Sequence, residues 1–250
     1  MKASISIAAL ALLLAGCGDQ GGETGNGSAG ASGPAAAAIP APNGGDWTQT
    51  VSPSAEGGFV MGNPNAPVRL VEYASMTCSH CAEFSETGAQ PLIDKYVKTG
   101  QVSFEIRNFV RDPADLAAAL LARCGGPGPF FKLTDQMFAA QEEWIGKLQG
   151  MSQAEQQQLS ALQPQQVVGA MAERAGLVQF VRVRGVPAER AQQCLANEAE
   201  INRLVQIQQK AVQDNPSFPG TPAFLINGKL AENAGTWEAL EPKIREALGS

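Results

Sequence analysis

The sequence predicts an α/β domain with a long helical insertion. Two segments rich in β-branched and apolar residues flank a helix that begins at a Cys-x-x-Cys motif. A block of about 100 residues with helical periodicity follows, and two short strands with a final helix close the chain. The predicted order is therefore β-α-β, a helical block, then β-β-α.

The first 16 residues are expected to be a signal peptide. One basic residue, Lys2, precedes an apolar run that is too short to span a bilayer but fits the core of such a peptide. The run ends in Leu14-Ala15-Gly16-Cys17, which resembles a bacterial lipobox. We expect Cys17 to be lipidated and to anchor the protein on the periplasmic side of a bacterial envelope. An ordinary secretory signal with an incidental cysteine is the alternative.

A flexible tether is predicted over residues 17–54. This segment is rich in Gly, Ala, Ser and Pro, a composition that does not offset the entropy lost on ordering. Residues 55–250 are long enough for one substantial core. Without Lys2, 17 basic residues face 24 acidic ones, a net charge of −7. Since no basic block is present, nucleic acid is not an expected partner.

The first half of the domain reads as strand, helix, strand. Residues 68–73 follow a turn signal rich in Asn and Pro, and 102–109 alternate apolar and polar side chains. Between them, a helix is expected from the cysteine motif to Tyr96, with a kink at Pro91. A crossover helix implies that the two strands are parallel.

The helical block is expected over about 113–214, where apolar side chains recur at helical spacing and are more often core than binding surface. Its Gln-rich part, 153–166, is predicted to be a solvated helix edge with a loop. Residues 223–226 then form a short strand, and Asn227-Gly228 suits a two-residue hairpin turn. A helix from about 236 to 248 completes the fold.

The motif Cys78-Ser79-His80-Cys81 holds the only histidine of the chain. Two thiols in the first turn of a helix can close a small disulfide, and free N–H groups there stabilise a thiolate at Cys78. His80 adds a donor or a positive charge. A stable thiolate is a good leaving group, so the pattern predicts dithiol–disulfide exchange in the oxidising direction. A purely structural disulfide is disfavoured, because a four-residue loop constrains the unfolded chain little.

With Cys17 assigned to lipid, the other cysteines divide into the close pair Cys78/Cys81 and the distant pair Cys124/Cys194. A second, structural disulfide between Cys124 and Cys194 is expected after export. Two buried free thiols are the alternative. A zinc site is disfavoured, because only one close cysteine pair exists and the sole histidine lies within it. No metal or cofactor is expected, and a Ser-His-Asp triad is unsupported.

A strand that runs into Cys-x-x-Cys, followed much later by Thr221-Pro222 and an Asn-Gly hairpin, resembles the thioredoxin fold. With its helical insertion, the chain is similar to the DsbA family of thiol:disulfide interchange proteins over about 58–248. The resemblance implies that Cys78 is the exposed attacking thiol and Cys81 the buried resolving one.

The resemblance has further implications for the site. It implies a cis peptide bond before Pro222, with the backbone of Thr221 pairing with a substrate strand. It also implies that Glu72 is a buried acid that assists proton transfer. Ser79 departs from the best-known members of the family, which carry proline there, and this leaves the backbone less restrained.

These features favour a membrane-tethered monomeric oxidase that introduces disulfides into exported cysteine-containing proteins. A membrane or soluble redox partner would reset its disulfide. Two alternatives stay open. One is an isomerase or reductase with the same chemistry, although a flexible tether stands where dimeric isomerases carry a dimerisation domain. The other is a non-catalytic lipoprotein that binds extended polypeptide beside Pro222.

Overall fold

The computed structural model describes residues 37–250, except for the side chains of residues 164 and 165. The described residues belong to one compact unit. The predicted signal peptide, Cys17 and residues 17–36 of the predicted tether lie outside them.

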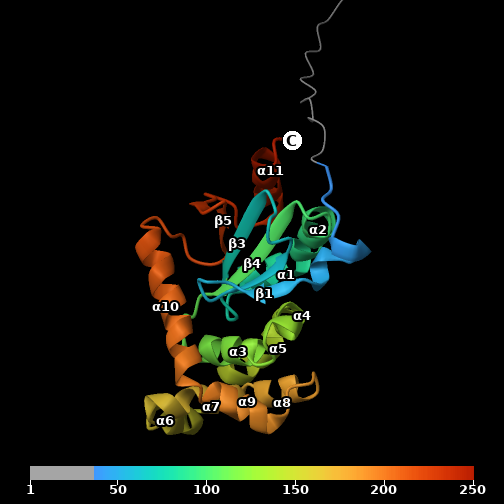
Figure 1. The fold of residues 1–250 in the computed structure, drawn as a ribbon. Coiled ribbons are helices and arrows are strands. Elements are labelled where there is room, and N and C mark those ends of the chain that lie inside the picture. The colour runs from blue at the N-terminus through green and yellow to red at the C-terminus, as the bar shows by residue number, and fades with distance from the viewer. Residues whose placement is uncertain (1–36) are drawn as a thin grey trace, which may run out of the picture. The chain divides into compact units, whose positions relative to one another are not determined.

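A six-stranded mixed sheet forms the centre of the domain (Figure 1). Its strand order is β1-β2-β4-β3-β5-β6, and only β3 and β4 are parallel. The strands are β1 Val51–Pro53, β2 Phe59–Gly62, β3 Val68–Ala74, β4 Val102–Asn108, β5 Ala223–Ile226 and β6 Lys229–Leu230.

The parallel pair β3–β4 positions the cysteine motif against the helical insertion. Every residue of β3 except Arg69 is buried, as expected for a strand at the centre of a covered sheet. Because the two strands are parallel, their carboxyl ends meet at one edge of the sheet, where Phe109 N–H donates to the carbonyl of Ala74 at 2.8 Å. The segment that leads to Cys78 and the segment that leads into the insertion therefore start side by side.

The expected first helix is divided into α1 Ser79–Thr87, α2 Ala89–Leu92 and a π-helical turn, η3 Ile93–Val97. The interruption falls at Gly88, not at Pro91 as predicted. A proline ring clashes with the carbonyl four residues earlier, here that of Thr87, so the helix is disturbed one turn before the proline. At Gly88, a side chain would also collide with the Phe84 ring.

Eight helices lie between β4 and β5 in the described chain. They are α3 Pro113–Arg123, α4 Pro127–Ala139, α5 Gln141–Gln149, α6 Gln153–Ser160, α7 Pro164–Arg174, α8 Leu177–Arg182, α9 Ala188–Leu195 and α10 Glu198–Asp214. The last helix, α11, spans Trp237–Ala247. The predicted α/β fold with a helical insertion is confirmed, and the helices between β4 and β5 run from Pro113 to Asp214.

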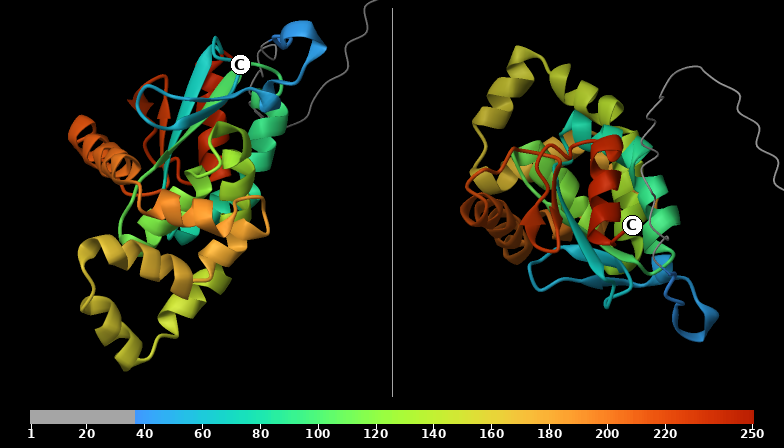
Figure 2. Two further views of the ribbon diagram at one scale, coloured as in Figure 1. Left: turned by 60° about the horizontal axis from the view of Figure 1, so that its bottom comes forward. Right: turned by 90° about the horizontal axis from the view of Figure 1, so that it is seen from above.

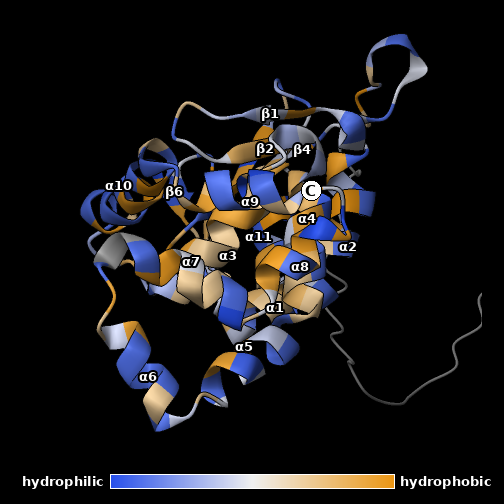
Figure 3. Ribbon diagram, turned by 90° about the horizontal axis from the view of Figure 1, so that it is seen from below, coloured by the Kyte–Doolittle hydropathy of each residue, from blue (hydrophilic) through white to orange (hydrophobic). Residues whose placement is uncertain are grey.

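Helix α6 is the least integrated part of the insertion. None of its residues is buried, and Figures 2 and 3 show it at the margin of the insertion, joined through its ends to α5 and α7. A capping box between Ser152 and Glu155 satisfies its first turn. The Gln-rich sequence accordingly forms a solvated helix.

The folded domain begins earlier than predicted, so the tether boundary at residue 54 is too late. Trp47 is buried and donates from Nε1 to the carbonyl of Ile39 at 2.7 Å, and β1 pairs with β2. Strand β2 was not predicted, because its four residues follow Gly57-Gly58 and lack room for a clear alternation. The burial of Trp47 and the pairing of β1 with β2 therefore give an ordered structure to a segment whose composition is that of a linker.

Within residues 37–250, no helix has the length and apolar character needed to cross a membrane.

Candidate active site

The two reactive cysteines lie where β3 passes into α1. After β3 ends at Ala74, three residues bring the chain to Cys78, the N-cap of α1, and Cys81 follows in the first turn. Cys78 N–H donates to the carbonyl of Ser75 at 3.1 Å, so the connection is a tight turn. Both cysteines are thiols in this structure.

Exposure does not separate the two thiols. Cys78 is 5% exposed and Cys81 is fully buried, so the expectation of an exposed Cys78 is wrong. The physical reason is the loop before β5, which lies against the motif: Cys78 Sγ donates to the carbonyl of Thr221 at 3.1 Å. A client must therefore displace or share this contact.

Ionisation separates the two thiols clearly. A hydrogen bond from the Cys81 side chain is the main reason that the pKa of Cys78 falls to about 5. The Thr221 side chain, the Cys81 N–H and the charge of Arg111 lower it further, against an opposing effect of burial. Burial raises the pKa of Cys81 well above its ordinary value, as do its hydrogen bond to Cys78 and the charge of Glu72. At neutral pH, Cys78 is a thiolate and Cys81 a thiol.

Glu72 is a buried acid in β3, and burial raises its pKa to about 8, with a smaller effect from the charge of Cys78. The carboxyl group is therefore protonated at neutral pH. It lines a cavity of about 570 Å³ together with Phe84 and Thr134. A group that changes protonation near pH 8 beside a buried thiol can donate or accept the proton of that thiol.

Two helices of the insertion hold the turn before Cys78. Asp115 of α3 accepts from Ser75 Oγ at 2.6 Å and from Met76 N–H at 2.7 Å. Gln141, the first residue of α5, donates from Nε2 to the carbonyls of Met76 and Cys78 at 2.8 and 2.9 Å. Both side chains are buried, so they fix the backbone of the turn in a water-poor environment.

Arg111 and Asp112 contact the residue that precedes Cys78. Arg111 Nη2 donates to Thr77 Oγ1 at 2.9 Å, and Asp112 Oδ2 accepts from the same hydroxyl group at 3.1 Å. Asp112 also caps α3 by accepting from Ala114 N–H. Arg111 thereby brings a positive charge to the Cys78 thiolate from the start of the insertion.

His80 is exposed and has no hydrogen bond or ion pair with the described residues. The groups that chiefly lower the pKa of Cys78 belong to Cys81, Thr221 and Arg111. His80, the second of the two residues between the cysteines, therefore faces solvent.

The Thr221–Pro222 peptide bond is cis, and Thr221 Oγ1 is buried without a hydrogen-bond partner in the described part of the chain. This hydroxyl group is free to turn toward the Cys78 thiolate. The other two cysteines of residues 37–250 are far from the motif in sequence. Cys124, which follows α3, and Cys194 of α9 are joined by a disulfide.

Sequence reasoning missed four residues around the turn: Arg111, Asp112, Asp115 and Gln141. The pattern Asp112-Pro113 marks the start of a helix, and the strand pairing places that start near the motif. The positions of Asp112 and Asp115 near the motif could therefore have been predicted from the sequence. Gln141 left no signal, because its role depends on how α5 packs. Within residues 37–250, His, Cys, Asp and Glu form no group of three or more suited to a metal ion.

Residues 54–246 match the family described as thioredoxin, which is more than half of the chain. The chain belongs to the thioredoxin family. A crystal structure of a protein-disulfide isomerase from Novosphingobium aromaticivorans is similar, with 34% identity and a TM-score of 0.71 over 76% of this chain and 97% of that one. The fold of Wolbachia pipientis alpha-DsbA1 also matches, with 20% identity and a TM-score of 0.60 over 84% and 94% of the two chains. The predicted resemblance to the DsbA family is confirmed at the level of the fold.

A relative in Rickettsia prowazekii carries the provisional name of a protein-disulfide oxidoreductase. It is 31% identical over 176 residues, which are 70% of this chain and 56% of that protein. The chain thus spans little more than half the length of the curated relatives that it matches.

Proposed function

We propose that this thioredoxin-family protein is a thiol:disulfide oxidoreductase that introduces disulfides into exported proteins through Cys78 and Cys81. The observation that carries the proposal is the opposite shift of the two thiol pKa values, to about 5 at Cys78 and well above the ordinary value at Cys81. Stabilising the Cys78 thiolate favours the reduced pair, so the oxidised pair tends to pass its disulfide to a client.

The exchange takes two steps. A client thiolate attacks Cys78 Sγ in the oxidised protein, the Cys78–Cys81 bond breaks, and Cys81 leaves as a thiolate. Given its high pKa, Cys81 then takes up a proton, which Glu72 supplies. A second client thiolate attacks the client sulfur of the mixed disulfide and expels Cys78 as a thiolate. The client loses two electrons to form its disulfide, and the pair gains them until a redox partner resets it.

The Thr221 backbone is the proposed docking edge for the client strand. Its carbonyl oxygen lies 3.1 Å from Cys78 Sγ, so an extended chain that pairs with Thr221 would bring its cysteine to the reactive sulfur. Cys78 then receives the client, and Cys81 is the leaving group of the first step.

Variants of the two cysteines test these roles. Offered a peptide whose cysteine is already in a disulfide with glutathione, Cys81→Ala should form a mixed disulfide at Cys78 as one thiolate is expelled, without completing turnover, whereas Cys78→Ala should form none. Trapping on Cys81 in the second variant would reverse the assignment. If the double Ser variant retained the full cellular function, the protein would be a binding lipoprotein instead.

A disulfide isomerase is the second candidate, because the Novosphingobium aromaticivorans relative carries that name. The two activities separate in refolding assays. An oxidase should accelerate disulfide formation in a reduced client far more than it rearranges scrambled disulfides, and an isomerase should show the opposite ratio.

We further propose that the mature protein is a monomer tethered by lipid at Cys17 on the periplasmic side of the envelope. The support is the Leu14-Ala15-Gly16-Cys17 sequence and the linker composition that follows it. Intact-mass analysis should show a chain that begins at acylated Cys17. The wild type should partition into detergent, and Cys17→Ser should move the protein to the aqueous phase. An unmodified Cys17 would overturn the anchor and leave the redox proposal standing.

A further inference from the structure

The loop before β5 brings Thr221 to the reactive sulfur and has few backbone donors with which to hold itself in place. Residues 218–222 include two prolines, which have no N–H group. The loop approaches the motif through the Thr221 carbonyl oxygen, which lies 3.1 Å from Cys78 Sγ. Side-chain packing is therefore needed to fix where this loop lies.

The first side chain of this loop, Phe218, lies between two other rings. Phe109 stacks on it, with ring centroids 4.9 Å apart and an angle of 18° between the planes. Tyr73 meets it edge to face, with centroids 5.5 Å apart and an angle of 85°. Both are favoured geometries of aromatic pairs. We call Tyr73, Phe109 and Phe218 the aromatic cluster; its first two members are buried and Phe218 is half-buried.

Tyr73 is a fixed member of the aromatic cluster. It belongs to β3, the strand that leads to Cys78. Arg107 Nη1 donates to the Tyr73 hydroxyl oxygen at 3.2 Å, and the guanidinium group lies 5.7 Å from the centre of the Tyr73 ring. Glu105 in turn holds Arg107 through two hydrogen bonds, of 2.7 and 2.9 Å. The Tyr73 ring is thus held from the side away from Phe218.

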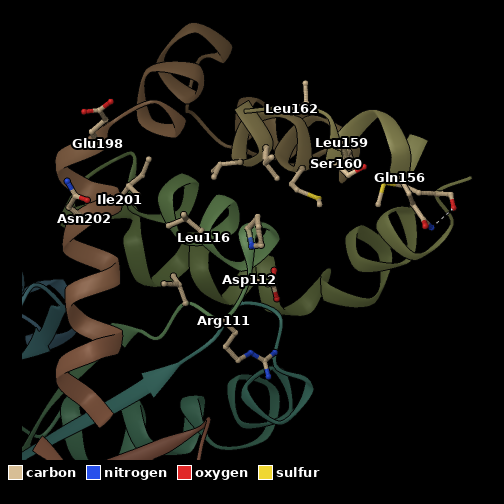
Figure 4. A pocket seen from close by; sticks show the side chains of 16 residues that line it. Arg111, Asp112, Leu116, Gln156, Leu159, Ser160, Leu162, Glu198, Ile201 and Asn202 are labelled. Carbon is tan, nitrogen blue, oxygen red and sulfur yellow. Dashed lines mark hydrogen bonds between the residues drawn. The ribbon is translucent and has the colours of Figure 1, made fainter. Parts of the chain in front are cut away.

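Phe109 is fixed to the same reactive turn. Its N–H group donates to the carbonyl of Ala74, the last residue of β3. Two residues later, Arg111 donates to the hydroxyl oxygen of Thr77, just before Cys78. Figure 4 shows the Arg111 side chain pointing away from the apolar wall of the cavity in the insertion, toward the segment that carries the motif. Both partners of the Phe218 ring are therefore tied to the turn that holds the nucleophile.

We propose that Phe218 is a positioning residue of thiol–disulfide exchange, whose ring in the aromatic cluster sets where Thr221 lies relative to Cys78. Only Pro219 and Gly220 separate Phe218 from Thr221, so a displaced ring displaces Thr221 as well. The Thr221 hydroxyl group helps to lower the pKa of Cys78, and the Thr221 backbone is the proposed docking edge. The proposal rests on the proposed function, since it concerns the docking edge of that site.

Phe218→Ala should separate client docking from the chemistry at Cys78. The KM for an extended cysteine peptide should rise about tenfold, as loss of one hydrogen bond between the peptide and Thr221 would produce. The pKa of Cys78 should rise, in the same direction as in Thr221→Val. Exchange of the reduced protein with hydroxyethyl disulfide, which is too small to pair with Thr221, should stay as in the wild type, because Cys78 remains ionised at neutral pH.

Two further variants separate positioning from packing. Phe218→Tyr keeps the stacked ring and should retain the wild-type KM and the wild-type pKa of Cys78. Phe180→Ala is the matched control, because Phe180 of α8 is also half-buried and has the Arg184 guanidinium 3.5 Å from its ring centre. It should leave the KM and the pKa unchanged. Thermal unfolding shows which variants are folded.

If folded Phe218→Ala kept either the wild-type KM or the wild-type pKa of Cys78, the proposal would be overturned, and so would it be if Phe180→Ala showed the same changes. If Phe218→Ala did not fold, Phe109→Leu, which removes the stacked ring but keeps apolar bulk, would be measured against the same expectations. Failure of the wild type to exchange with hydroxyethyl disulfide would instead remove the proposed function. The pKa comparison would then still decide the role of Phe218, because it needs no turnover.

Discussion

At the scale of single residues, the two thiols differ through their hydrogen bonds and not through their exposure. The side chains of Cys81 and Thr221 lower the pKa of Cys78, whereas burial and the charge of Glu72 raise the pKa of Cys81. The same three-residue spacing could have produced two equivalent thiols. The surrounding side chains produce one that is ionised and one that is not.

Thr221→Val should raise the pKa of Cys78 toward the ordinary thiol value. The substitution keeps the shape of the side chain and removes the hydroxyl group that helps to hold the thiolate. Titration of the ultraviolet absorbance of the thiolate measures the change, with the exposed Thr50→Val as the control. An unchanged titration would show that the Thr221 hydroxyl group has no part in stabilising the thiolate.

Glu72→Gln should increase the free energy of unfolding of the reduced protein at high pH. The pKa of Glu72 is about 8 in the folded protein against an ordinary value of 4.5, so the unfolded chain binds fewer protons between these values. The contribution of Glu72 to stability is therefore full below about pH 4.5 and is lost as pH rises through 8. The loss is on the order of 5 kcal/mol.

Urea unfolding of wild type and Glu72→Gln across this pH range measures the effect. Cys78 has the opposite sign, because its lowered pKa adds stability as pH rises above about 5. The comparison of the two proteins at each pH therefore isolates Glu72. Parallel curves for the two proteins would contradict its burial as a neutral acid.

At the scale of elements, the insertion supports the reactive turn of the sheet domain. Helix α3 supplies Asp115 and helix α5 supplies Gln141, and each side chain bonds to the residues just before or at Cys78. The insertion therefore positions Cys78.

Gln141→Leu should destabilise the protein by about 1–3 kcal/mol, because the buried carbonyl of Met76 loses its donor. The exposed Gln149→Leu on the same helix is the matched control. Denaturant unfolding gives the free energy of unfolding. The rate of Cys78 alkylation reports whether the turn before Cys78 keeps its conformation. Equal stability of the two variants would exclude Gln141 as a support of the motif.

Removal of the Cys124–Cys194 disulfide should lower stability without abolishing exchange. The two cysteines are 70 residues apart, so the cross-link restricts the unfolded chain. In the chain-entropy model this contributes about 4 kcal/mol to the free energy of unfolding. Unfolding of Cys124→Ala/Cys194→Ala measures the loss, and exchange with glutathione should persist. Loss of exchange in a folded double variant would assign this disulfide a redox role.

At the scale of the whole molecule, the sequence was informative wherever local chemistry decides structure. The β3–α1–β4 unit, the hairpin at Asn227-Gly228 and the extent of the insertion follow from periodicity and turn residues. The start of the domain did not follow, because Trp47 lies against Gly100 and β2 pairs with β4, both far along the chain.

The candidate site divides in the same way. The cysteines could be named from the motif, and Thr221 and Glu72 from the resemblance to the DsbA family. Gln141 could not be named, since its contact joins residues 63 positions apart. The sequence also indicated His80 as a modulator of Cys78. Its exposed position predicts that His80→Leu changes the pKa of Cys78 less than Thr221→Val does.

The reduction potential of the Cys78/Cys81 pair, measured by equilibration with glutathione, tests the central claim most directly. A Cys78 thiolate with a pKa near 5 stabilises the reduced pair, so the potential should lie well above the value of about −270 mV found for thioredoxin. A potential at or below that value would mean that the pair is a reductant, and it would contradict the proposed oxidase.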